Sequence, residues 1–150
     1  MQLFGKVVAA AGTRGNALVC VEAIGAGQPI LRIAGPRVAE PGIYTIQCGE
    51  TAHIHAEQSA WAFINHACEP NCAIDFATWE LASLRPIRAG EEITYNDLST
   101  EWDMASPFSC GCGAAHCPGT VRGFRYLNET QRDAIAPMLS PFLRRTTRRR

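Results

Sequence analysis

Three thiols lie within eight residues near the end of the chain, in the segment Cys110-Gly-Cys112-Gly-Ala-Ala-His-Cys117. The glycines of this segment allow a tight loop that directs the sulfur atoms toward one point. Structural zinc takes four ligands in a closed tetrahedron, with each thiolate about 2.3 Å from the metal. The spacing therefore predicts a zinc site that needs one further ligand.

The fourth ligand has two possible sources. His116 directly precedes the last of the three cysteines, and adjacent residues rarely reach one ion together without strain. Cys68, which lies in a polar turn of its own, is the better candidate. The other interpretation of a cysteine, a small buried hydrophobic residue, suits Cys20 and Cys48, because each lies in or beside a candidate strand.

A second group of polar residues lies in the segment Phe63-Ile-Asn-His-Ala-Cys-Glu-Pro-Asn71. It combines an apolar approach with Asn65, His66 and a Pro-Asn turn. On its own the segment suggests only that the Asn65 and His66 side chains hydrogen-bond to loop backbone.

Composition indicates one globular domain. The chain has 150 residues, of which 47% are apolar and 19% charged, as in ordinary packed proteins. Seven cysteines cannot all pair within one chain, so disulfides are the weaker explanation of the cysteine content. No export signal and no run of about 18 apolar residues is readable, so we expect a soluble, intracellular protein without membrane contact.

Charge is unevenly distributed although the formal net charge is zero. Five of the fourteen basic residues lie in the last seven positions, and residues 1–143 carry nine basic against fourteen acidic side chains. This pattern predicts an acidic body with a mobile, solvated Arg-rich tail over residues 144–150, and nucleic acid contact only indirectly or through that tail.

Short, strand-like segments must position the two polar groups. Glycines and prolines divide residues 1–120 into pieces that are typical of β structure. The expected strands are 7–11, 17–21, 29–33, 42–47, 73–75, 80–86 and 92–95. A short helix is expected over 58–64, and another begins after Asn128, with Gln131 completing a capping box. No βαβ alternation supports a doubly wound nucleotide-binding fold.

Four segments in order resemble the SET domain, the fold of protein-lysine methyltransferases that use S-adenosylmethionine. Gly12-Thr-Arg-Gly-Asn-Ala-Leu and Glu22-Ala-Ile-Gly-Ala-Gly-Gln-Pro-Ile resemble the opening glycine motifs of the family. Asn65-His-Ala-Cys-Glu-Pro-Asn matches N-H-S-C-x-P-N, and Leu84-Arg-Pro-Ile-Arg-Ala-Gly-Glu-Glu-Ile-Thr-Tyr matches R-x-I-x-x-G-E-E-[IL]-T-[FY]. The three later cysteines match the post-SET C-x-C-x4-C loop. The resemblance covers about residues 5–125.

The resemblance implies a mainly β, SET-type fold of small sheets with a C-terminal pseudoknot, a zinc-bound post-SET loop and a short C-terminal helix. In this interpretation residues 1–105 form the SET domain and 106–125 the zinc loop. Residues 126–143 form a helical segment, and 144–150 the Arg-rich tail.

The same resemblance implies roles for individual residues. Zinc would be held by Cys68, Cys110, Cys112 and Cys117. S-adenosylmethionine would be bound by Arg14, Gly15, Asn16, Asn65, His66 and Val121. Phe108 and Trp102 are further candidates for the cofactor pocket, with a role as plain core aromatics as the alternative.

The sequence departs from the family at its catalytic strand. Tyr95 aligns with the aromatic residue of E-[IL]-T-[FY]-x-Y, and Asp97 occupies the position of the final tyrosine. Ala62 also replaces a family arginine. A carboxylate at position 97 favours the ammonium form of a lysine, which is the wrong form for nucleophilic attack.

Three functional hypotheses follow. The first is a protein-lysine methyltransferase with Tyr95 and Asp97 as catalytic residues, acting on a lysine-containing, basic protein in the cytoplasm or nucleus. The second is a catalytically weak or inactive module that binds cofactor or a lysine-bearing peptide, with Asp97 pairing with the ammonium group. The third is a zinc-stabilised scaffold unrelated to methylation, which requires the order of the four segments to be coincidence.

Overall fold

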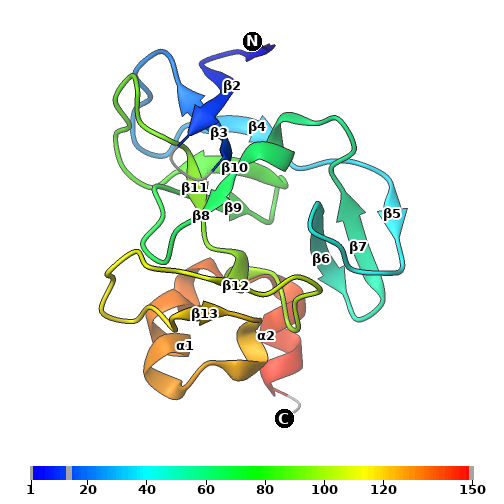
Figure 1. The fold of residues 1–150 in the computed structure, drawn as a ribbon. Coiled ribbons are helices and arrows are strands. Elements are labelled where there is room, and N and C mark those ends of the chain that lie inside the picture. Colours follow the sequence, from blue (N-terminus) through cyan, green and yellow to red (C-terminus); the bar gives the residue numbers. More distant parts are fainter. Residues whose placement is uncertain (1, 13–14, 149–150) are drawn as a thin grey trace.

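Short strands dominate the fold (Figure 1). The computed structural model describes residues 2–12 and 15–148. Within these ranges thirteen strands are grouped into five small sheets, accompanied by short helices. The prediction of a mainly β fold of small sheets is therefore confirmed.

The first sheet is an antiparallel meander at the N-terminus. Its strands are β1 (Gln2–Phe4), β2 (Val7–Gly12) and β3 (Gly15–Cys20). Val7 and Leu18 are fully buried, whereas the described residues at the tip of the β2–β3 hairpin are exposed. Gly15 begins β3 with a φ of 95°, a conformation that side chains other than that of glycine rarely adopt. The hairpin thus has a buried base and an exposed tip.

Two further antiparallel sheets have three strands each. One contains β4 (Pro29–Arg32), β10 (Glu80–Ser83) and β9 (Cys72–Asp75), in that order. The other contains β5 (Arg37–Val38), β7 (Ala52–His55) and β6 (Thr45–Gly49), and lies to one side of the molecule in Figure 1. Both sheets contribute to the same hydrophobic core, through Leu81 of β10, Ile46 of β6 and Ile54 of β7.

A parallel pair of strands joins two distant parts of the chain. Strand β8 (Asn65–His66) pairs with β11 (Thr94–Tyr95), and the Ala67 amide donates to the Tyr95 carbonyl at 3.0 Å. The 3₁₀ helix η1 (Ala60–Phe63) precedes β8, and η2 (Asp97–Ser99) follows β11. The two segments that the expected pseudoknot requires are therefore side by side.

The C-terminal part forms a second group of elements, the yellow to red ribbon of Figure 1. Its elements are β12 (Phe108–Ser109), β13 (Thr120–Val121), η3 (Phe124–Tyr126), α1 (Glu129–Ile135), η4 (Ala136–Met138) and α2 (Pro141–Arg148). The predicted capping box of α1 is confirmed, because Asn128 Oδ1 accepts from the Gln131 amide at 2.9 Å and Gln131 Oε1 from the Asn128 amide at 3.0 Å.

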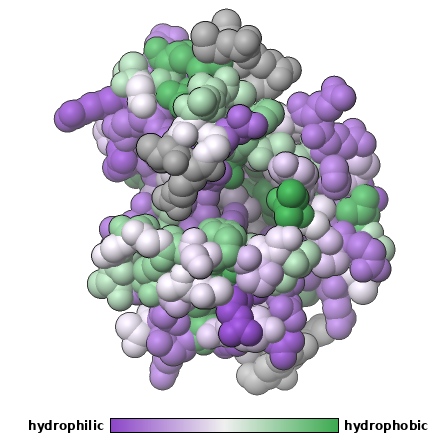
Figure 2. All heavy atoms as spheres, in the orientation of Figure 1, coloured by the Kyte–Doolittle hydropathy of each residue, from purple (hydrophilic) through white to green (hydrophobic). Residues whose placement is uncertain are grey.

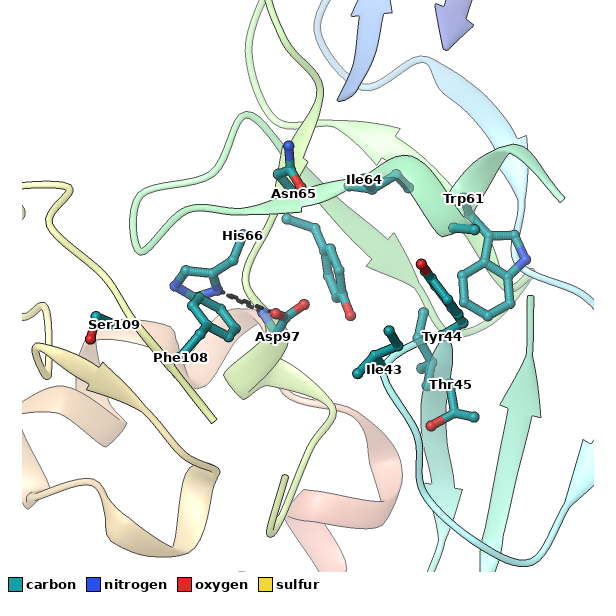
Figure 3. Close-up of a pocket in the computed structure, with 13 residues that line it drawn as sticks. Ile43, Tyr44, Thr45, Trp61, Ile64, Asn65, His66, Asp97, Phe108 and Ser109 are labelled. Carbon is teal, nitrogen blue, oxygen red and sulfur yellow. Dashed lines mark hydrogen bonds and ion pairs between the residues drawn. The ribbon is translucent and has the colours of Figure 1, made fainter. Parts of the chain in front are cut away.

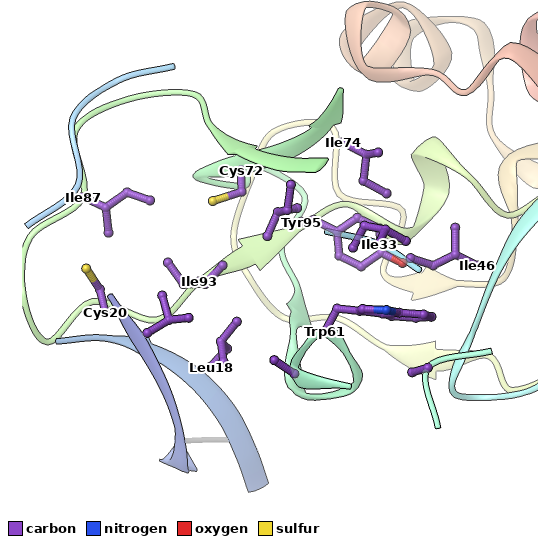
Figure 4. Close-up of a cluster of buried hydrophobic side chains, with 14 of the residues drawn as sticks. Leu18, Cys20, Ile33, Ile46, Trp61, Cys72, Ile74, Ile87, Ile93 and Tyr95 are labelled. Carbon is purple, nitrogen blue, oxygen red and sulfur yellow. The ribbon is translucent and has the colours of Figure 1, made fainter. Parts of the chain in front are cut away.

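Two hydrophobic clusters stabilise these two groups of elements. The larger one contains Leu18, Leu81, Ile93 and Trp61 and draws on the first three sheets and on β11 (Figure 4). Cys20, which is 1% exposed, belongs to it, as expected for a buried hydrophobic residue. The smaller cluster lies among the C-terminal elements and contains Cys68, Leu98, Cys110, Val121, Phe124, Leu127, Ile135, Leu139 and Leu143. Cys68 and Leu98 come from the first part of the chain, so the two parts share this second core.

Strand boundaries differ in places from the sequence expectation. The segment expected over 42–47 is β6, which begins only at Thr45, because the preceding turn is closed by hydrogen bonds between Gly42 and the Thr45 hydroxyl at 2.9 Å. Strand β7 was not predicted, although Ala52-His-Ile-His55 alternates apolar and polar residues. Four residues are too short for this alternation to be a clear signal, and the antiparallel pairing with β5 and β6 makes the segment the central strand of its sheet.

Residues 144–148, expected to be part of a mobile, solvated tail over residues 144–150, are helical instead, although Arg144, Arg145 and Arg148 are exposed as expected. Helix α2 extends to Arg148 and has Leu143 fully buried in the C-terminal core. The Ser140 hydroxyl accepts from the Leu143 amide at 3.2 Å at the start of the helix, and the Arg144 guanidinium donates to the Leu139 carbonyl at 3.1 Å. Capping and one buried side chain thus stabilise a helix in this segment. Residues 149 and 150 lie outside the described residues.

None of the helices in the described residues combines the length and the apolar character that crossing a membrane requires.

Candidate functional site

Four cysteine side chains converge at the junction of the two parts of the chain. The sulfur atoms of Cys68, Cys110, Cys112 and Cys117 all lie within 4.8 Å of one another. A tetrahedral zinc site with thiolates about 2.3 Å from the metal has sulfur atoms roughly 3.8 Å apart, and the Cys68 and Cys110 sulfurs are 3.9 Å apart. The predicted ligand set is therefore brought together, and its donor type and spacing fit a tetrahedral metal ion.

Three thiols of this cluster, those of Cys68, Cys110 and Cys112, have shifted pKa values. Burial raises the pKa of Cys68 far above its ordinary value, and hydrogen bonds with Cys112 and Cys117 raise it further. Burial also raises the pKa of Cys110. Burial opposes ionisation of Cys112 as well, but hydrogen bonds from the Ala114 amide and the neighbouring thiols outweigh it and lower the pKa of Cys112 to about 7. Ionisation of Cys68 and Cys110 is thus costly without a cation that stabilises their thiolate forms.

The two histidines near the cluster do not replace a cysteine. His116 Nε2 lies 3.0 Å from the Cys68 carbonyl oxygen, so it contacts the backbone of the loop. His66 Nδ1 accepts from the Asp97 amide at 3.1 Å, which leaves the proton on Nε2, 3.3 Å from the Cys68 sulfur. His66 therefore lies between the cysteine cluster and the start of η2.

Strands β8 and β11 bring Asn65, His66, Tyr95 and Asp97 together. The Asn65 side-chain amide donates to the Asn16 carbonyl at 3.0 Å and to Glu92 Oε1 at 2.6 Å. These two hydrogen bonds therefore connect the first hairpin to the segment that leads into β11.

The pairing of these strands is supported by a buried asparagine that follows β8. The Asn71 side chain donates to the Glu92 carbonyl at 2.8 Å and accepts from the Thr94 amide at 2.9 Å. Asn71 is 5% exposed, so these bonds are shielded from water. The N-H-x-C-x-P-N segment thus fixes the position of β11 as well as its own turn.

Three adjoining cavities surround these residues. The first, of about 320 Å³, is lined by both strands, by Phe108 and by the β5–β6 segment around Tyr44 (Figure 3). The second, of about 180 Å³, shares five lining residues with the first, namely Ile43, Thr45, Tyr95, Asp97 and Phe108. The third, of about 450 Å³, shares Tyr44, Ala62 and Asn65 with the first and also reaches Asn16 and Glu57. The three cavities share walls around the β8–β11 pair, and together they are called the hollow.

The titratable groups of the hollow have raised pKa values. Burial raises the pKa of Tyr95 well above its ordinary range, and the charges of Asp97 and Glu101 raise it further. Burial raises the pKa of Asp97 to about 6, although a hydrogen bond from Tyr95 partly offsets the effect. Burial likewise raises the pKa of Glu101 to about 8, against hydrogen bonds from Thr100 and the Gln47 amide. Tyr95 is therefore a stable hydrogen-bond donor at neutral pH, while Asp97 is mainly ionised.

Of the remaining predicted cofactor residues, some lie beside the cavities and one does not. Gly15 and Asn16 lie at the hairpin next to the third cavity, and Arg14 lies outside the described residues. Val121 is fully buried and pairs with Phe108 across β12 and β13, and it does not line the three cavities.

The two aromatic candidates are separated. Phe108 lines two of the cavities and contacts the His66 ring edge-on, with the ring centres 5.5 Å apart. Trp102 lines a different cavity, beside Gln47 and Arg145.

Two residues that line the cavities were not predicted from the sequence. Glu101 lines the second cavity, and Tyr44 lines the first and third. The segment Leu98-Ser-Thr-Glu-Trp102 gave one signal, an acidic residue between otherwise apolar or hydroxyl-bearing neighbours. Tyr44 stands in a Pro-Gly turn that gave no signal of a pocket.

Comparison with known proteins identifies related sequences. The SET domain family model matches residues 15–96. The chain is 36% identical over 104 residues to the methyltransferase flvH of Aspergillus flavus, which covers 67% of this chain and 58% of the relative. It is 33% identical over 84 residues to a histone-lysine N-methyltransferase, H3 lysine-36 specific, of Chaetomium globosum, covering 51% of this chain and 9% of the relative.

A third relative is the histone-lysine N-methyltransferase, H3 lysine-4 specific, of Emericella nidulans. The identity is 38% over 64 residues, covering 38% of this chain and 5% of the relative. The chain therefore spans little more than half of the first relative and a small part of the other two. Because the family model matches more than half of the chain, this protein belongs to the SET domain family.

Proposed function

We propose that the chain is an S-adenosylmethionine-dependent protein-lysine methyltransferase. The observation that carries this proposal is the cavity in which Asn65 and His66 of β8 lie beside Tyr95 and Asp97 (Figure 3). Membership of the family and the names of three relatives support the class of reaction. When bound, S-adenosylmethionine supplies a methyl group on a positively charged sulfur.

The first and third cavities are the proposed cofactor site. Their volumes, about 320 and 450 Å³, lie in the range of small-molecule pockets. Asn65 and His66 would orient the two ends of the cofactor, and the exposed Gly15 and Asn16 backbone would approach it closely. Arg14 remains a proposed ligand on the resemblance alone. Val121 would act at the adenine end as the cross-strand partner of Phe108.

The four-cysteine cluster is the proposed zinc site. Cys68 follows β8, while Cys110, Cys112 and Cys117 belong to the C-terminal loop, so the metal would join the loop to the SET core. His66 contacts both the Cys68 sulfur and the Asp97 amide. Zinc binding would therefore also fix the position of a cofactor-site residue.

Tyr95 and Asp97 are the proposed catalytic residues. A lysine side chain has an ordinary pKa of about 10.4, so it must lose a proton before it can act as a nucleophile. The Asp97 carboxylate would hold the incoming ammonium group, and the proton would pass to solvent, because a carboxylate with a pKa of about 6 is too weak a base to take it. The Tyr95 hydroxyl, which donates a hydrogen bond to Asp97, would orient this carboxylate.

The second candidate function is a binding module, and Asp97 favours it. A carboxylate stabilises an ammonium group that it contacts, which opposes loss of the proton. In this case the protein binds cofactor or a lysine-bearing peptide and transfers little or no methyl group.

The proposed substrate is a lysine-bearing protein of basic character, because residues 1–143 carry more acidic than basic side chains. A nuclear location is proposed on the names of the histone-specific relatives.

Transfer of a labelled methyl group distinguishes the two candidates. Wild type and Asp97→Tyr are incubated with labelled S-adenosylmethionine and a mixture of lysine-rich proteins, and cofactor binding is measured by calorimetry. The enzyme proposal expects label on protein with the wild type. Transfer by Asp97→Tyr alone, with equal cofactor affinity in both proteins, would favour the binding module.

A further inference from the structure

Basic residues gather in the C-terminal part of the chain. Residues 118–150 contain eight arginines and two acidic residues, whereas residues 1–117 contain six basic and twelve acidic residues. Six of these eight arginines lie in the described part of the chain, and their side chains are called the basic surface: Arg122, Arg125, Arg132, Arg144, Arg145 and Arg148. They belong to the elements that follow β13, at the end of the molecule opposite the N-terminal sheet (Figure 1).

The first half of the basic surface is a group of cations around an aromatic ring. The Arg122 guanidinium lies 4.3 Å from the centre of the Tyr126 ring, and the Arg125 guanidinium lies 5.3 Å from it. Arg132 adjoins this pair, because its guanidinium donates to the Arg125 carbonyl at 3.1 Å. Among residues 2–12 and 15–148, Asp103 is the one carboxylate that forms an ion pair with the basic surface, with Arg125 at 3.1 Å. Most of the positive charge is therefore not neutralised within the fold.

The second half of the basic surface lies on α2, which contains no acidic residue. The Arg144 guanidinium donates to the Leu139 and Ala136 carbonyls at 3.1 Å each, and these neutral acceptors leave its charge in place. Arg148 lies one helical turn after Arg144, so the two like charges repel each other. The helix dipole favours Arg145 and Arg148 in the last turn of α2, but it does not act on the first half.

Helix α1 links the two halves. Arg132 lies on this helix and donates to the Leu127 carbonyl before its start, whereas Arg144 donates to the Ala136 carbonyl directly after its end. A helix of seven residues is about 10 Å long, which sets the separation of the two halves. Double-stranded DNA carries one negative charge for about every 1.7 Å of its axis. One duplex therefore presents phosphates to both halves at once.

The composition of the basic surface favours phosphate as its partner. All its cations are arginines, and Lys6 is the one lysine of the chain. The planar guanidinium binds two phosphate oxygens at once, which an ammonium group cannot do.

The basic surface lacks the apolar anchors of other kinds of interface. In residues 118–148 the one large hydrophobic side chain that is exposed is Tyr126, and Arg122 lies over its ring. The apolar side chain of Leu143 on α2 is fully buried. Protein interfaces depend on exposed apolar or aromatic anchors, and helices that bind membrane surfaces depend on an apolar face. A nucleic acid backbone requires neither.

We propose that the basic surface binds the phosphate backbone of double-stranded nucleic acid without reading its base sequence. This inference goes beyond the proposed function, because none of the six arginines lines the three cavities of the hollow. A basic protein bound to nucleic acid presents both kinds of charge. The chain has the complement of each, an acidic part in residues 1–117 and a basic part in residues 118–150.

The test measures binding of the full chain to a fluorescent DNA duplex of about 20 base pairs by anisotropy, over salt concentrations from about 50 to 200 mM. The variant Arg122→Gln/Arg148→Gln removes one guanidinium from each half of the basic surface. The matched control, Arg32→Gln/Arg88→Gln, removes the same charge from two exposed arginines outside the C-terminal part.

The wild type is expected to bind the duplex with a dissociation constant that rises steeply with salt. The test variant is expected to bind about tenfold more weakly at 50 mM salt. Its plot of log affinity against log salt is expected to be less steep by about 1.8, because each lost phosphate contact lowers the slope by about 0.9. The control keeps the wild-type slope. If the double variant does not fold, Arg145→Gln replaces it, with a slope lower by about 0.9.

Three results would overturn the proposal. The first is no binding of the wild type to the duplex at 50 mM salt, and the second is an equal loss in the test variant and the control. The third is stronger binding to polyglutamate or to phosphatidylserine vesicles than to the duplex, which would assign the basic surface to an acidic protein or a membrane. Calorimetry with S-adenosylmethionine is expected to give the same affinity for wild type and test variant, so the result is independent of methyl transfer.

Discussion

Replacing Asn71 by alanine is expected to lower the free energy of unfolding by more than the loss of one small side chain would suggest. The Asn71 side chain contacts two backbone groups of the segment that forms β11, the Glu92 carbonyl and the Thr94 amide, at 2.8 and 2.9 Å. In Asn71→Ala both groups lose their partner in a site where Asn71 itself is only 5% exposed. Each buried unsatisfied group costs about 1–3 kcal/mol, so the expected loss for the two groups is about 2–6 kcal/mol in the free energy of unfolding.

Urea unfolding at a fixed zinc concentration measures this loss as a lower transition midpoint with an unchanged slope. The control is Asn128→Ala, because the Asn128 side chain also accepts a hydrogen bond from a backbone amide, that of Gln131, but on the exposed cap of α1. Removing an N-cap costs about 1 kcal/mol. A loss in Asn71→Ala no larger than that in Asn128→Ala would refute the reasoning that Asn71 fixes β11 in place.

Three further perturbations test other parts of the account. Cys112→Ser is expected to lose the one bound zinc ion in native mass spectrometry, whereas Cys48→Ser keeps it; equal metal content in both would contradict the four-cysteine site. Burial raises the pKa of Asp97 from 3.8 to about 6, so the folded state binds this proton more tightly than the unfolded state. The stabilisation that this proton contributes is fully present below about pH 4 and is lost as the pH rises through 6. Asp97→Asn is therefore expected to be 1–3 kcal/mol more stable than wild type at pH 8, by roughly 1.4 kcal/mol for each pKa unit, and a flat difference between the two proteins from pH 3.5 to 7 would count against it. Leu143→Ala is expected to lower the free energy of unfolding by about 2–4 kcal/mol, and Arg148→Ala by less than about 0.5, in thermal or urea unfolding; similar small losses would mean that α2 does not belong to the core.

The sequence predicted the elements whose signals are local. Segments enriched in Val, Ile and Leu between turn residues located β2, β3 and β4, and the Asn128–Gln131 spacing located the start of α1. The spacing of the cysteines, with the geometric argument against His116, predicted the set that the fold brings together.

Features that depend on tertiary contacts were not predictable in the same way. Strand β7 exists because β5 and β6 pair with it, and α2 continues to Arg148 because Leu143 packs into a core that only the folded chain forms. Glu101 joins the site through burial beside Gln47, which is 54 residues away in the chain. The family resemblance located the β8–β11 crossing, which local propensity does not indicate.

Surface character gives little independent guidance to the site. Figure 2 shows a mixed surface on which apolar residues form separate patches among polar ones. Ile43 is 66% exposed and Tyr44 49%, and both line the central hollow. The concave shape and the charge of the hollow therefore indicate the site better than surface hydropathy does.

The most direct measurement is the position of a labelled methyl group after incubation of the wild type with labelled S-adenosylmethionine and a mixture of basic proteins. Mass spectrometry of the digested proteins locates the label. The account predicts label on the ε-nitrogen of lysine side chains with the wild type, and a large loss in Asn65→Ala, which removes a side chain from the wall of the cofactor cavity. Absence of label with wild type that binds the cofactor, or label on residues other than lysine, would contradict it.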